Sequence, residues 1–351
     1  MGGHFEMKKW MKISGLSMIS ILTSATGLFA TSGASAATTA QRASHLNFRL
    51  GVVLKTLSNP YWVAMKDGVE AEAKKLGVKV DIQAATTEGS ISGQVNILNT
   101  MENKNYNAYI VAPITGNNLI PQLQTLTHNR VPIINVDSPV DPIQAKAAGV
   151  KLDTFISSNN FLAGEIAGSY MAKILHHKGQ VAVVEGLAGD ATSQARMNGF
   201  DKAAKAGGLK VVTALPGNWD RLTALNDATE IMSAHPQLRG FYACNDDMAL
   251  GVFQAVKNVH KTGSVKVVGT DGILQSMQSI ASGGMAGTVS QYPFEEGVLS
   301  VQAAVDVLEG KKIPSQISSP IQLITQANAK AAIKKFPAPF VPFKDPLPQV
   351  K

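Results

Sequence analysis

Cysteine is almost absent from this chain of 351 residues, which contains Cys244 alone. A single cysteine cannot form an internal disulfide, and no cysteine near the N-terminus offers a site for a lipid anchor. Cys244 ends an apolar run, so we interpret it as a buried, inert thiol rather than a catalytic one. Stability must therefore come from a hydrophobic core, and the chain is long enough for two domains of ordinary size.

The motifs of the common enzyme classes are also missing. We find no Gly-rich dinucleotide fingerprint, no phosphate-binding loop and no nucleophile elbow, and the seven histidines show no metal-ligand spacing. The formal net charge of +7 is small and scattered, without basic clusters interleaved with aromatic residues. These absences predict a protein that is not an enzyme, uses no cofactor or metal, and does not bind nucleic acid.

Long uninterrupted hydrophobic runs are lacking too. The N-terminus has a basic stretch with Lys8 and Lys9, an apolar stretch over 13–30 that Ser, Gly and Thr interrupt, and small residues at 34–36. This order is typical of a secretory signal peptide over residues 1–36, cleaved near Ala36, and it falls short of the roughly 20 apolar residues of a membrane span. We expect an exported chain that resides in a periplasm, whether translation starts at Met1 or Met7.

What the sequence does contain is a regular alternation of apolar strand-like runs and amphipathic helical stretches. In the first unit an apolar run over 51–54 precedes Asn59-Pro60, a helix N-cap followed by proline at the first helical position, and Gly77 supplies the stop. Further strands are expected near Ala108–Val111, 131–136, 180–184, 210–213, 240–244, 265–269 and Gly287–Ser290. Helices are expected near 92–101, 118–128, 160–175, 192–206, Arg221–Ala234, 246–256, Leu274–Ala281 and 294–308.

Repeated βα units of this kind predict an α/β fold with parallel sheets. Because they exceed one comfortable sheet, we divide them into two similar doubly wound lobes, with the break near 154–159. The tail from Phe336 contains five prolines and is expected to form neither a helix nor a central strand.

Four of the apolar runs end in a polar residue. Lys55 follows 50–54, Asp137 follows 131–136, Asn245 follows 240–244 and Asp271 follows 265–270. Because the carboxyl ends of parallel strands face the ligand crevice of such sheets, these side chains should converge on one site.

Residues 55–62 form the densest candidate segment, since they place Lys55, Asn59, Tyr61 and Trp62 at the mouth of the first strand. Aromatic rings in that position can stack on the apolar face of a sugar. An ordinary capped helix whose rings pack in the core explains the segment equally well.

Asp137 and Asp271 could each accept hydrogen bonds from neighbouring hydroxyls, and Arg196 could donate in a planar fork. Together these groups suit an uncharged, polyhydroxylated ligand. Taken singly, each has a structural explanation: a surface salt bridge for Asp or Arg, an N-cap for Asn245, an edge position for Gln291, and a helix-entry hydrophobe for Trp219.

The combination of segments resembles the periplasmic binding proteins of the ribose-binding type over nearly all of the chain after residue 36. The segments that carry the resemblance are 55–62, 136–137, 196–200, 219–221, 244–251, 269–272 and 290–291. Residues 53–60, 76–78 and 103–106 resemble the allose-binding members of that family. Ala112 departs from the ribose pattern, which has an asparagine there, and Lys55 stands where the ribose type has a serine.

The resemblance implies a role for each candidate site residue. Hydrogen bonds to the sugar come from Asn59, Asp137, Arg196, Asn245, Asp271 and Gln291, the rings of Tyr61, Trp62 and Trp219 enclose it, and Lys55 matches the allose-type site. It also implies two lobes joined by three crossings near Ser158, Gln291 and Pro320. One lobe would combine 46–158 with 292–320 and the other 159–291 with 321–335, leaving a Pro-rich tail over 336–351.

These observations predict a monomeric periplasmic subunit of an ATP-driven (ABC) sugar importer, which binds a monosaccharide such as allose or a related hexose and docks on a membrane permease. A sensor that presents its closed form to a chemoreceptor or histidine kinase is the alternative. A repressor would need a DNA-binding helix-turn-helix where the export signal lies. A glycosidase using Asp137 and Asp271 is disfavoured because the rings and Arg196 suit holding a sugar better than cleaving it.

Overall fold

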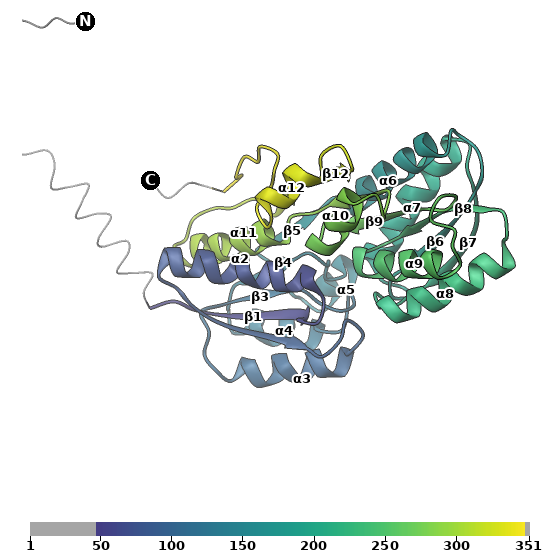
Figure 1. The fold of residues 1–351 in the computed structure, drawn as a ribbon. Helices are drawn as coiled ribbons and strands as arrows, with labels where there is room; N and C mark the ends of the chain where they lie inside the picture. Colours follow the sequence, from purple (N-terminus) through teal and green to yellow (C-terminus); the bar gives the residue numbers. More distant parts are fainter. Residues whose placement is uncertain (1–46, 348–351) are drawn as a thin grey trace, which may run out of the picture. The chain divides into compact units, whose positions relative to one another are not determined.

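Two six-stranded sheets organise residues 47–347, the part of the chain that the computed structural model describes (Figure 1). The expected signal peptide and the last four residues of the tail lie outside this range. The described residues belong to one unit, Arg42–Lys351. We call each sheet with the helices packed on it a lobe.

The first sheet has the order β2-β1-β3-β4-β5-β11, and all its strand pairs are parallel. Its strands are β1 (Arg49–Thr56), β2 (Lys79–Ala85), β3 (Ala108–Val111), β4 (Ile133–Val136), β5 (Thr154–Ser158) and β11 (Gln316–Ser319). Its helices are α2 (Pro60–Leu76), α3 (Ile91–Glu102), α4 (Ile120–His128), α5 (Pro142–Ala147) and α11 (Pro293–Leu308).

The second sheet repeats this pattern with the order β7-β6-β8-β9-β10-β12, where only β12 runs antiparallel to its neighbour. Its strands are β6 (Gln180–Glu185), β7 (Lys210–Pro216), β8 (Leu238–Ala243), β9 (Lys266–Asp271), β10 (Gly287–Ser290) and β12 (Gln322–Thr325). Its helices are α6 (Asn160–Ile174), α7 (Ala191–Ala206), α8 (Arg221–Ala234), α9 (Asp246–Asn258), α10 (Leu274–Ala281) and α12 (Ala329–Lys335).

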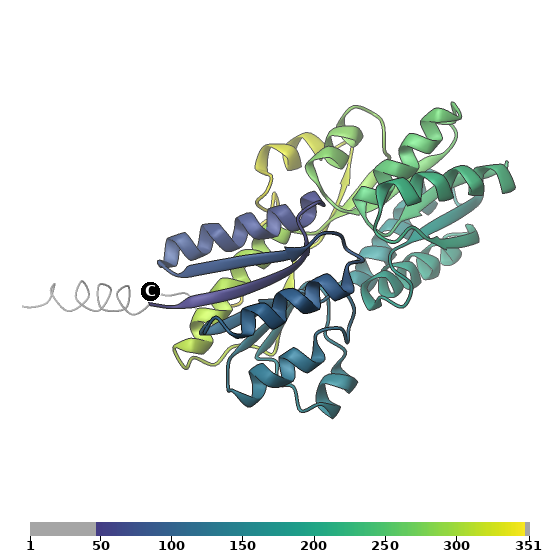
Figure 2. The same cartoon turned by 90° about the horizontal axis from the view of Figure 1, so that it is seen from below.

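Strand β1 shows why each sheet is covered on both faces. Its alternate residues Leu50, Val52 and Leu54 join the core beneath α2 and α11, while Val53 joins the core beneath α3 and α4. Successive side chains of a strand point to opposite faces, so a strand buried on both sides reads as one continuous apolar run. In Figure 2, α2 and α11 lie side by side on one face of this sheet.

The chain crosses between the lobes three times within the described residues. It passes from β5 to α6 after Ser158, from β10 to α11 at Gln291 and Tyr292, and from β11 to β12 around Pro320. The prediction of two similar doubly wound lobes with three crossings is confirmed, and it brings the carboxyl ends of both sheets toward the same region.

Several expected elements match the structure. Strands Ala108–Val111 and Gly287–Ser290 and helices Arg221–Ala234 and Leu274–Ala281 have the predicted bounds. The first crossing follows Ser158, within the segment 154–159 where the break between lobes was predicted, but the same segment also contains β5, a strand that was not expected. Four other short elements (α5, β11, β12 and α12) were not expected.

The described part of the tail, 336–347, contains no helix or strand. Phe336 and Phe340 pack against the core of the second lobe, whereas Phe343 and Leu347 pack against the core of the first. The tail therefore contacts both lobes. Within residues 47–347, every helix is too short or too polar to cross a bilayer.

Candidate functional site

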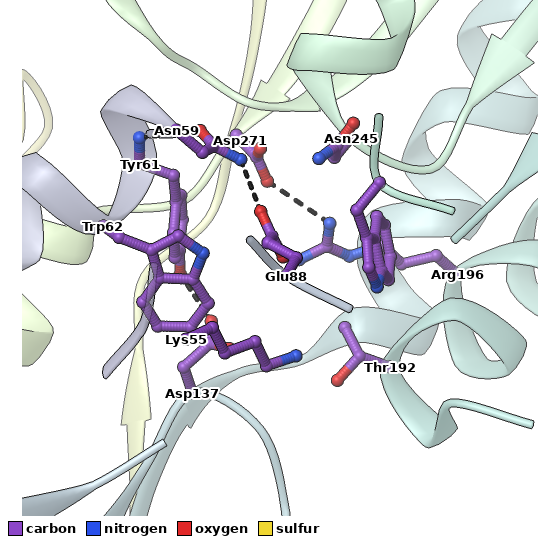
Figure 3. Close-up of a pocket in the computed structure, with 11 residues that line it drawn as sticks. Lys55, Asn59, Tyr61, Trp62, Glu88, Asp137, Thr192, Arg196, Asn245 and Asp271 are labelled. Atoms are coloured by element: carbon purple, nitrogen blue, oxygen red, sulfur yellow. Dashed lines mark hydrogen bonds and ion pairs between the residues drawn. The ribbon is translucent and has the colours of Figure 1, made fainter. Parts of the chain in front are cut away.

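A cavity of about 280 Å³ lies between the lobes, at the carboxyl ends of the strands. The first lobe contributes Lys55, Asn59, Tyr61, Trp62, Glu88 and Asp137, and the second contributes Thr192, Arg196, Trp219, Asn245 and Asp271 (Figure 3). The structure thus brings together every predicted site residue except Gln291. Strand order reverses between β1 and β3 and between β6 and β8, which is where open α/β sheets place their crevices.

The start of α2 fixes the orientation of two site residues. Asn59 caps the helix, because its Oδ1 accepts a hydrogen bond from the Tyr61 backbone N–H at 3.0 Å. Its Nδ2 remains available and donates to Glu88 Oε1 at 2.7 Å. The capped-helix interpretation and the site interpretation of this segment are therefore compatible, since one amide does both.

Glu88 is a cavity residue that our sequence analysis did not find. It follows the end of β2 by three residues, on a loop beside Asn59 and Lys55. Burial raises the pKa of Glu88, while the nearby charge of Lys55 opposes the rise. Thr192, on α7, is a second cavity residue that was not predicted. Glu88 lies three residues beyond β2 and Thr192 seven residues beyond β6, so neither follows an apolar run directly and the strand-end argument does not reach them.

Aromatic rings line the cavity from both lobes. Tyr61 and Trp62 of α2 meet edge to face with ring centroids 5.2 Å apart, and Trp219 precedes α8 in the second lobe. A Cβ on Gly186 would lie 2.1 Å from the Trp219 ring, so glycine is needed there for the indole to lie against the backbone. All three rings are buried, with 6% or less of their surface exposed.

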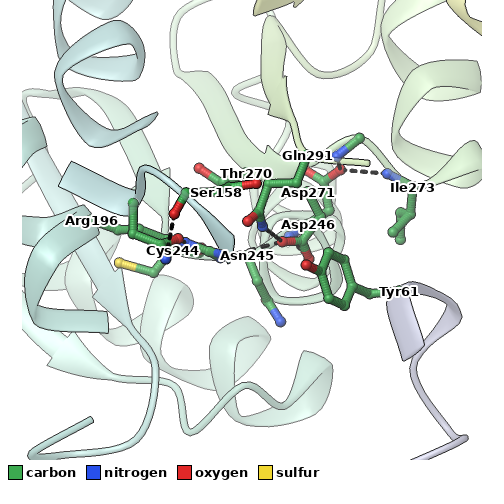
Figure 4. Close-up of polar contacts among 12 residues, drawn as sticks. Tyr61, Ser158, Arg196, Cys244, Asn245, Asp246, Thr270, Asp271, Ile273 and Gln291 are labelled. Carbon is green, nitrogen blue, oxygen red and sulfur yellow. Dashed lines mark hydrogen bonds and ion pairs between the residues drawn. The ribbon is translucent and has the colours of Figure 1, made fainter. Parts of the chain in front are cut away.

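Arg196 is held by three acceptors on the second-lobe side (Figure 4). Its Nη1 donates to the Cys244 carbonyl at 2.6 Å and to Asp271 Oδ1 at 3.2 Å, and its Nε donates to Asn160 Oδ1 at 2.8 Å. Burial is the largest single influence and acts to lower the pKa of Arg196, but Asp271, Tyr242, Asp137 and Tyr61 together outweigh it and leave that pKa raised. Arg196 thus keeps its positive charge, and these three acceptors fix the orientation of its remaining N–H donors.

Gln291 does not line the cavity. It lies behind Asp271, to whose Oδ1 it donates from Nε2 at 3.1 Å, and it is 2% exposed. The sugar contact implied for Gln291 by the family resemblance stays a prediction; at this second crossing its amide points to the Asp271 carboxylate. The Gln291 amide thus helps to orient the Asp271 carboxylate.

Asp137 has both carboxylate oxygens oriented by neighbours. Oδ1 accepts from the Tyr61 hydroxyl at 2.7 Å and Oδ2 accepts from the Ser138 hydroxyl at 2.7 Å. Its backbone has φ of 61°, in the left-handed region that non-glycine residues rarely adopt. Buried Glu296 lies beyond Tyr61, on the side away from the cavity.

Lys55 makes a contact between the lobes. Its Nζ lies 3.6 Å from Asp190 Oδ2, and both side chains are nearly inaccessible, with 3% and 4% exposed. Lys55 is the last residue but one of β1 in the first sheet, while Asp190 caps α7 of the second lobe. This ion pair was not predicted, and it requires the two lobes to be close together.

The described residues 47–347 contain no group of three or more His, Cys, Asp or Glu side chains arranged to hold a metal ion. The arrangement instead consists of hydrogen-bonding groups and rings around a small cavity. Such a cavity can bind a ligand rich in hydroxyl groups.

Two α/β lobes with three crossings and a polar, ring-lined cavity between them define the class of two-lobed binding proteins. Residues 50–312 match the family described as periplasmic binding protein domain. The chain belongs to this family, in its ribose-binding type.

Named relatives support this assignment. The chain is 40% identical over 276 residues to the D-allose-binding periplasmic protein of Escherichia coli, a match that covers 78% of this chain and 89% of that protein. It is 32% identical over 279 residues to the ribose import binding protein of Bacillus subtilis, covering 80% and 88%.

A solved structure extends the comparison to three dimensions. The periplasmic solute-binding protein of an ABC transporter from Actinobacillus succinogenes, with bound D-allose, superposes with a TM-score of 0.78 at 31% identity and covers 81% of this chain and 99% of that one. These relatives are binding proteins of importers, which confirms the prediction that the chain is not an enzyme.

Proposed function

We propose that this protein is the periplasmic substrate-binding subunit of an ABC sugar importer and that it binds one neutral monosaccharide, allose or a related hexose, in the cavity between its lobes. The observation that carries the proposal is the convergence of Asn59, Asp137, Arg196, Asn245 and Asp271 with three aromatic rings in that cavity. Carboxylates, amides and a guanidinium match the donors and acceptors of sugar hydroxyls, and the rings match the apolar faces of a pyranose.

The charges of the cavity favour a neutral ligand. Lys55 and Arg196 each have a carboxylate partner, Asp190 and Asp271 respectively. A carboxylate or phosphate on the ligand would therefore meet cations that are already paired, next to Glu88 and Asp137. Hydroxyl groups both donate and accept, so they can satisfy these groups without adding charge.

The volume of the cavity favours a single sugar ring. The space between the lining residues is about 280 Å³ even when the part that is open to solvent is included, which leaves little room for more than one sugar ring. Allose is proposed because the E. coli relative is named for D-allose and the A. succinogenes structure contains it. Lys55 at the cavity and Ala112 in place of the ribose-type asparagine support a ligand other than ribose.

Ligand binding is proposed to close the two lobes. A sugar held by both lobes favours the closed form, since only there does it meet all its partners. A membrane permease that recognises the closed form would then bind only the protein that carries sugar. We further propose lobe boundaries at 46–158 with 292–320 and 159–291 with 321–335, export with cleavage near Ala36, and a monomeric binding subunit.

The proposal is tested by calorimetric titration of residues 37–351 with a panel of aldoses, ketoses, polyols and sugar acids. We expect binding of D-allose or another hexose and no binding of sugar acids. Absence of binding across the panel would contradict the sugar assignment. A chemoreceptor or histidine-kinase partner, the alternative to a permease, would use the same binding event and would be distinguished by sugar uptake in cells that lack this protein.

The site is tested by Arg196→Met. Loss of three hydrogen bonds, with Asp271 left unpaired in a buried place, should weaken sugar binding roughly 100-fold or more. Lys205→Met is the matched control, because Lys205 lies on the same helix but is exposed and pairs only with Asp201. Equal affinity in both variants would refute the site.

A further inference from the structure

Glu296 is a buried carboxyl group that our account of the site does not yet use. It lies in the first turns of α11, and its side chain is fully buried. None of the ion pairs in the described part of the chain includes it. An unpaired buried carboxylate is costly, so a carboxyl group in such a place tends to keep its proton.

The contacts of Glu296 reach all three crossings between the lobes. Its Oε1 accepts from the hydroxyl of Ser158, the last residue before the first crossing, at 3.1 Å. Its backbone N–H donates to the carbonyl of Tyr292, at the second crossing, at 3.0 Å. The hydroxyl of Ser319, just before the third crossing, faces the same carboxyl group. The side chain of Glu296 thus lies beside the first and third crossings, and its helix starts at the second.

Glu296 also reaches the cavity, through Tyr61. The Tyr61 hydroxyl lies 2.7 Å from Asp137 Oδ1 and 3.4 Å from Glu296 Oε2. A phenol has one proton, so it can donate to only one of the two carboxyl groups. If that proton goes to Asp137, as the shorter distance indicates, the contact with Glu296 is a hydrogen bond only when Glu296 is the donor.

We propose that Glu296 is a positioning residue for ligand binding: in its protonated form it holds Tyr61 and Asp137 in the arrangement that receives the sugar, and its ionisation weakens binding and closure as pH rises. The inference rests on the proposed binding function of the cavity. The chemistry is a simple loss of the carboxyl proton to solvent, which leaves two carboxylates to compete for the Tyr61 proton next to the ligand.

The groups that face Glu296 support this direction. They are Tyr61 from α2, Asp137 from the loop after β4, Ser158 from β5, Ser319 from β11 and, at longer range, Arg196 from α7. Burial raises the pKa of Glu296 well above its ordinary value, and Asp137 adds to the rise, while the two serines and Arg196 oppose it. Burial and the two carboxyl groups likewise raise the pKa of Tyr61, which keeps its proton available for donation.

The first experiment measures the affinity for D-allose, or for the tightest-binding sugar of the panel, between pH 5 and pH 9. If the closed form holds the Glu296 proton more tightly than the open form, binding takes up a proton and affinity falls as pH rises through the pKa of Glu296. We expect a roughly tenfold loss of affinity in the wild type and a change of less than about twofold in Glu296→Gln, which keeps a neutral donor. A wild-type affinity that does not change with pH, or a Glu296→Gln variant with the wild-type slope, would overturn the inference.

Glu295→Gln is the matched control, because it is the same substitution one residue earlier on α11. Glu295 faces Glu72, Lys75 and Asp345 instead of the crossings, so its variant should keep the wild-type slope of affinity against pH. A flat profile in this control would also contradict the assignment to Glu296.

A second readout needs no ligand and separates this inference from the proposed function. As pH rises from 5 to 9, the melting temperature of Glu296→Gln should increase relative to that of the wild type. The reason is that only the wild type buries the ionisable carboxyl group of Glu296. If no sugar binds but this difference appears, the assignment of the cavity as a sugar site fails, whereas the assignment of Glu296 as a protonated buried carboxyl group is supported. If sugar binds and the difference is independent of pH, the inference fails alone.

Discussion

Three residues at the cavity adopt backbone conformations that disfavour ordinary side chains. Asp137, Trp219 and Asp271 have φ of 61°, 63° and 138°. Such conformations cost about 1–3 kcal/mol each and persist where surrounding contacts enforce them. The contacts here are the hydrogen bonds of the two carboxylates and the packing of the indole against Gly186. These contacts therefore hold the three side chains in place in the absence of a ligand.

Substitution of Asp137 should separate its side-chain role from its backbone cost. Both Asp137→Ala and Asp137→Gly remove the carboxylate and should weaken sugar binding by about 1–3 kcal/mol or more. Glycine accepts a positive φ without strain, so Asp137→Gly should be about 1 kcal/mol more stable than Asp137→Ala. Calorimetry gives the affinities, and urea unfolding gives the free energies. Equal stability of the two variants would show that the φ of 61° carries no cost.

The residue scale also shows what the sequence could and could not predict about the site. Asp137 and Asn245 follow apolar runs directly, so the strand-end argument places them at the cavity. Glu88 lies three residues beyond β2, and Gln291 turns away one residue beyond β10. Loop geometry decides whether a side chain near a strand end enters the cavity, and that geometry depends on tertiary contacts such as the bond from Asn59 to Glu88.

At the scale of elements, both lobes contain pairs of helices that approach closely through glycine. A Cβ on Gly68 of α2 would lie 2.0 Å from the Phe294 carbonyl oxygen, and one on Gly297 of α11 would lie 2.3 Å from the Met65 carbonyl oxygen. In the second lobe, a Cβ on Gly164 of α6 would lie 2.0 Å from the carbonyl oxygen of Arg196 on α7. These distances require that the two backbones touch with no side chain between them.

Alanine at these glycines should separate the paired helices. We expect Gly68→Ala and Gly164→Ala to destabilise the fold by about 1–3 kcal/mol, because inserted atoms in a packed contact force backbone shifts. Gly164→Ala should also weaken sugar binding, since the shifted turn of α7 carries Arg196. Urea unfolding and calorimetry measure the two effects. Gly263→Ala is the control, because its Cβ would meet no atom within 4 Å, and a similar loss in that variant would contradict the explanation.

The elements that the sequence predicted well are those with a strong periodic pattern of their own. Helix Arg221–Ala234 has an N-cap and buries residues three or four positions apart, at 224, 228, 231 and 232. Strand Ala108–Val111 is apolar on both faces. Strands Gln316–Ser319 and Gln322–Thr325 are four residues each and largely polar at their exposed positions. Their pairing with β5 and β10 defines them as strands, and no local pattern reveals that pairing.

At the scale of the whole described molecule, the ion pair between Lys55 and Asp190 is an attraction between opposite charges on the two lobes. Each partner is buried in this structure, and the proposed opening of the lobes would expose both to water. Buried ion pairs gain attraction but lose hydration, so their net effect on closure must be measured. Because both side chains are nearly inaccessible, added salt should screen the pair much less than it screens surface charges.

Asp190→Asn tests this link with little disturbance of the fold. Asparagine caps helices as well as aspartate does, so α7 should keep its N-cap while the charge is lost. With Lys55 left without its partner in the closed form, we expect roughly tenfold weaker sugar binding and a larger radius of gyration of the ligand-free protein by small-angle X-ray scattering.

Asp220→Asn is the control for this prediction. Asp220 caps α8 in the same way but is exposed, and the same substitution there should leave affinity and radius unchanged. In a double-mutant cycle that is read from the radius of gyration of the ligand-free protein, Lys55→Met should add little to Asp190→Asn, since both remove the same pair. Fully additive effects would show that the pair does not couple the lobes.

The three crossings have a consequence for synthesis of the protein. The first sheet gains its last strand, β11, only at residues 316–319, and the second gains β12 only at residues 322–325. A nascent chain that has emerged as far as α10 therefore has an uncovered edge on both sheets and lacks α11, which buries the apolar face of α2. Neither sheet can gain its last strand until translation has almost ended.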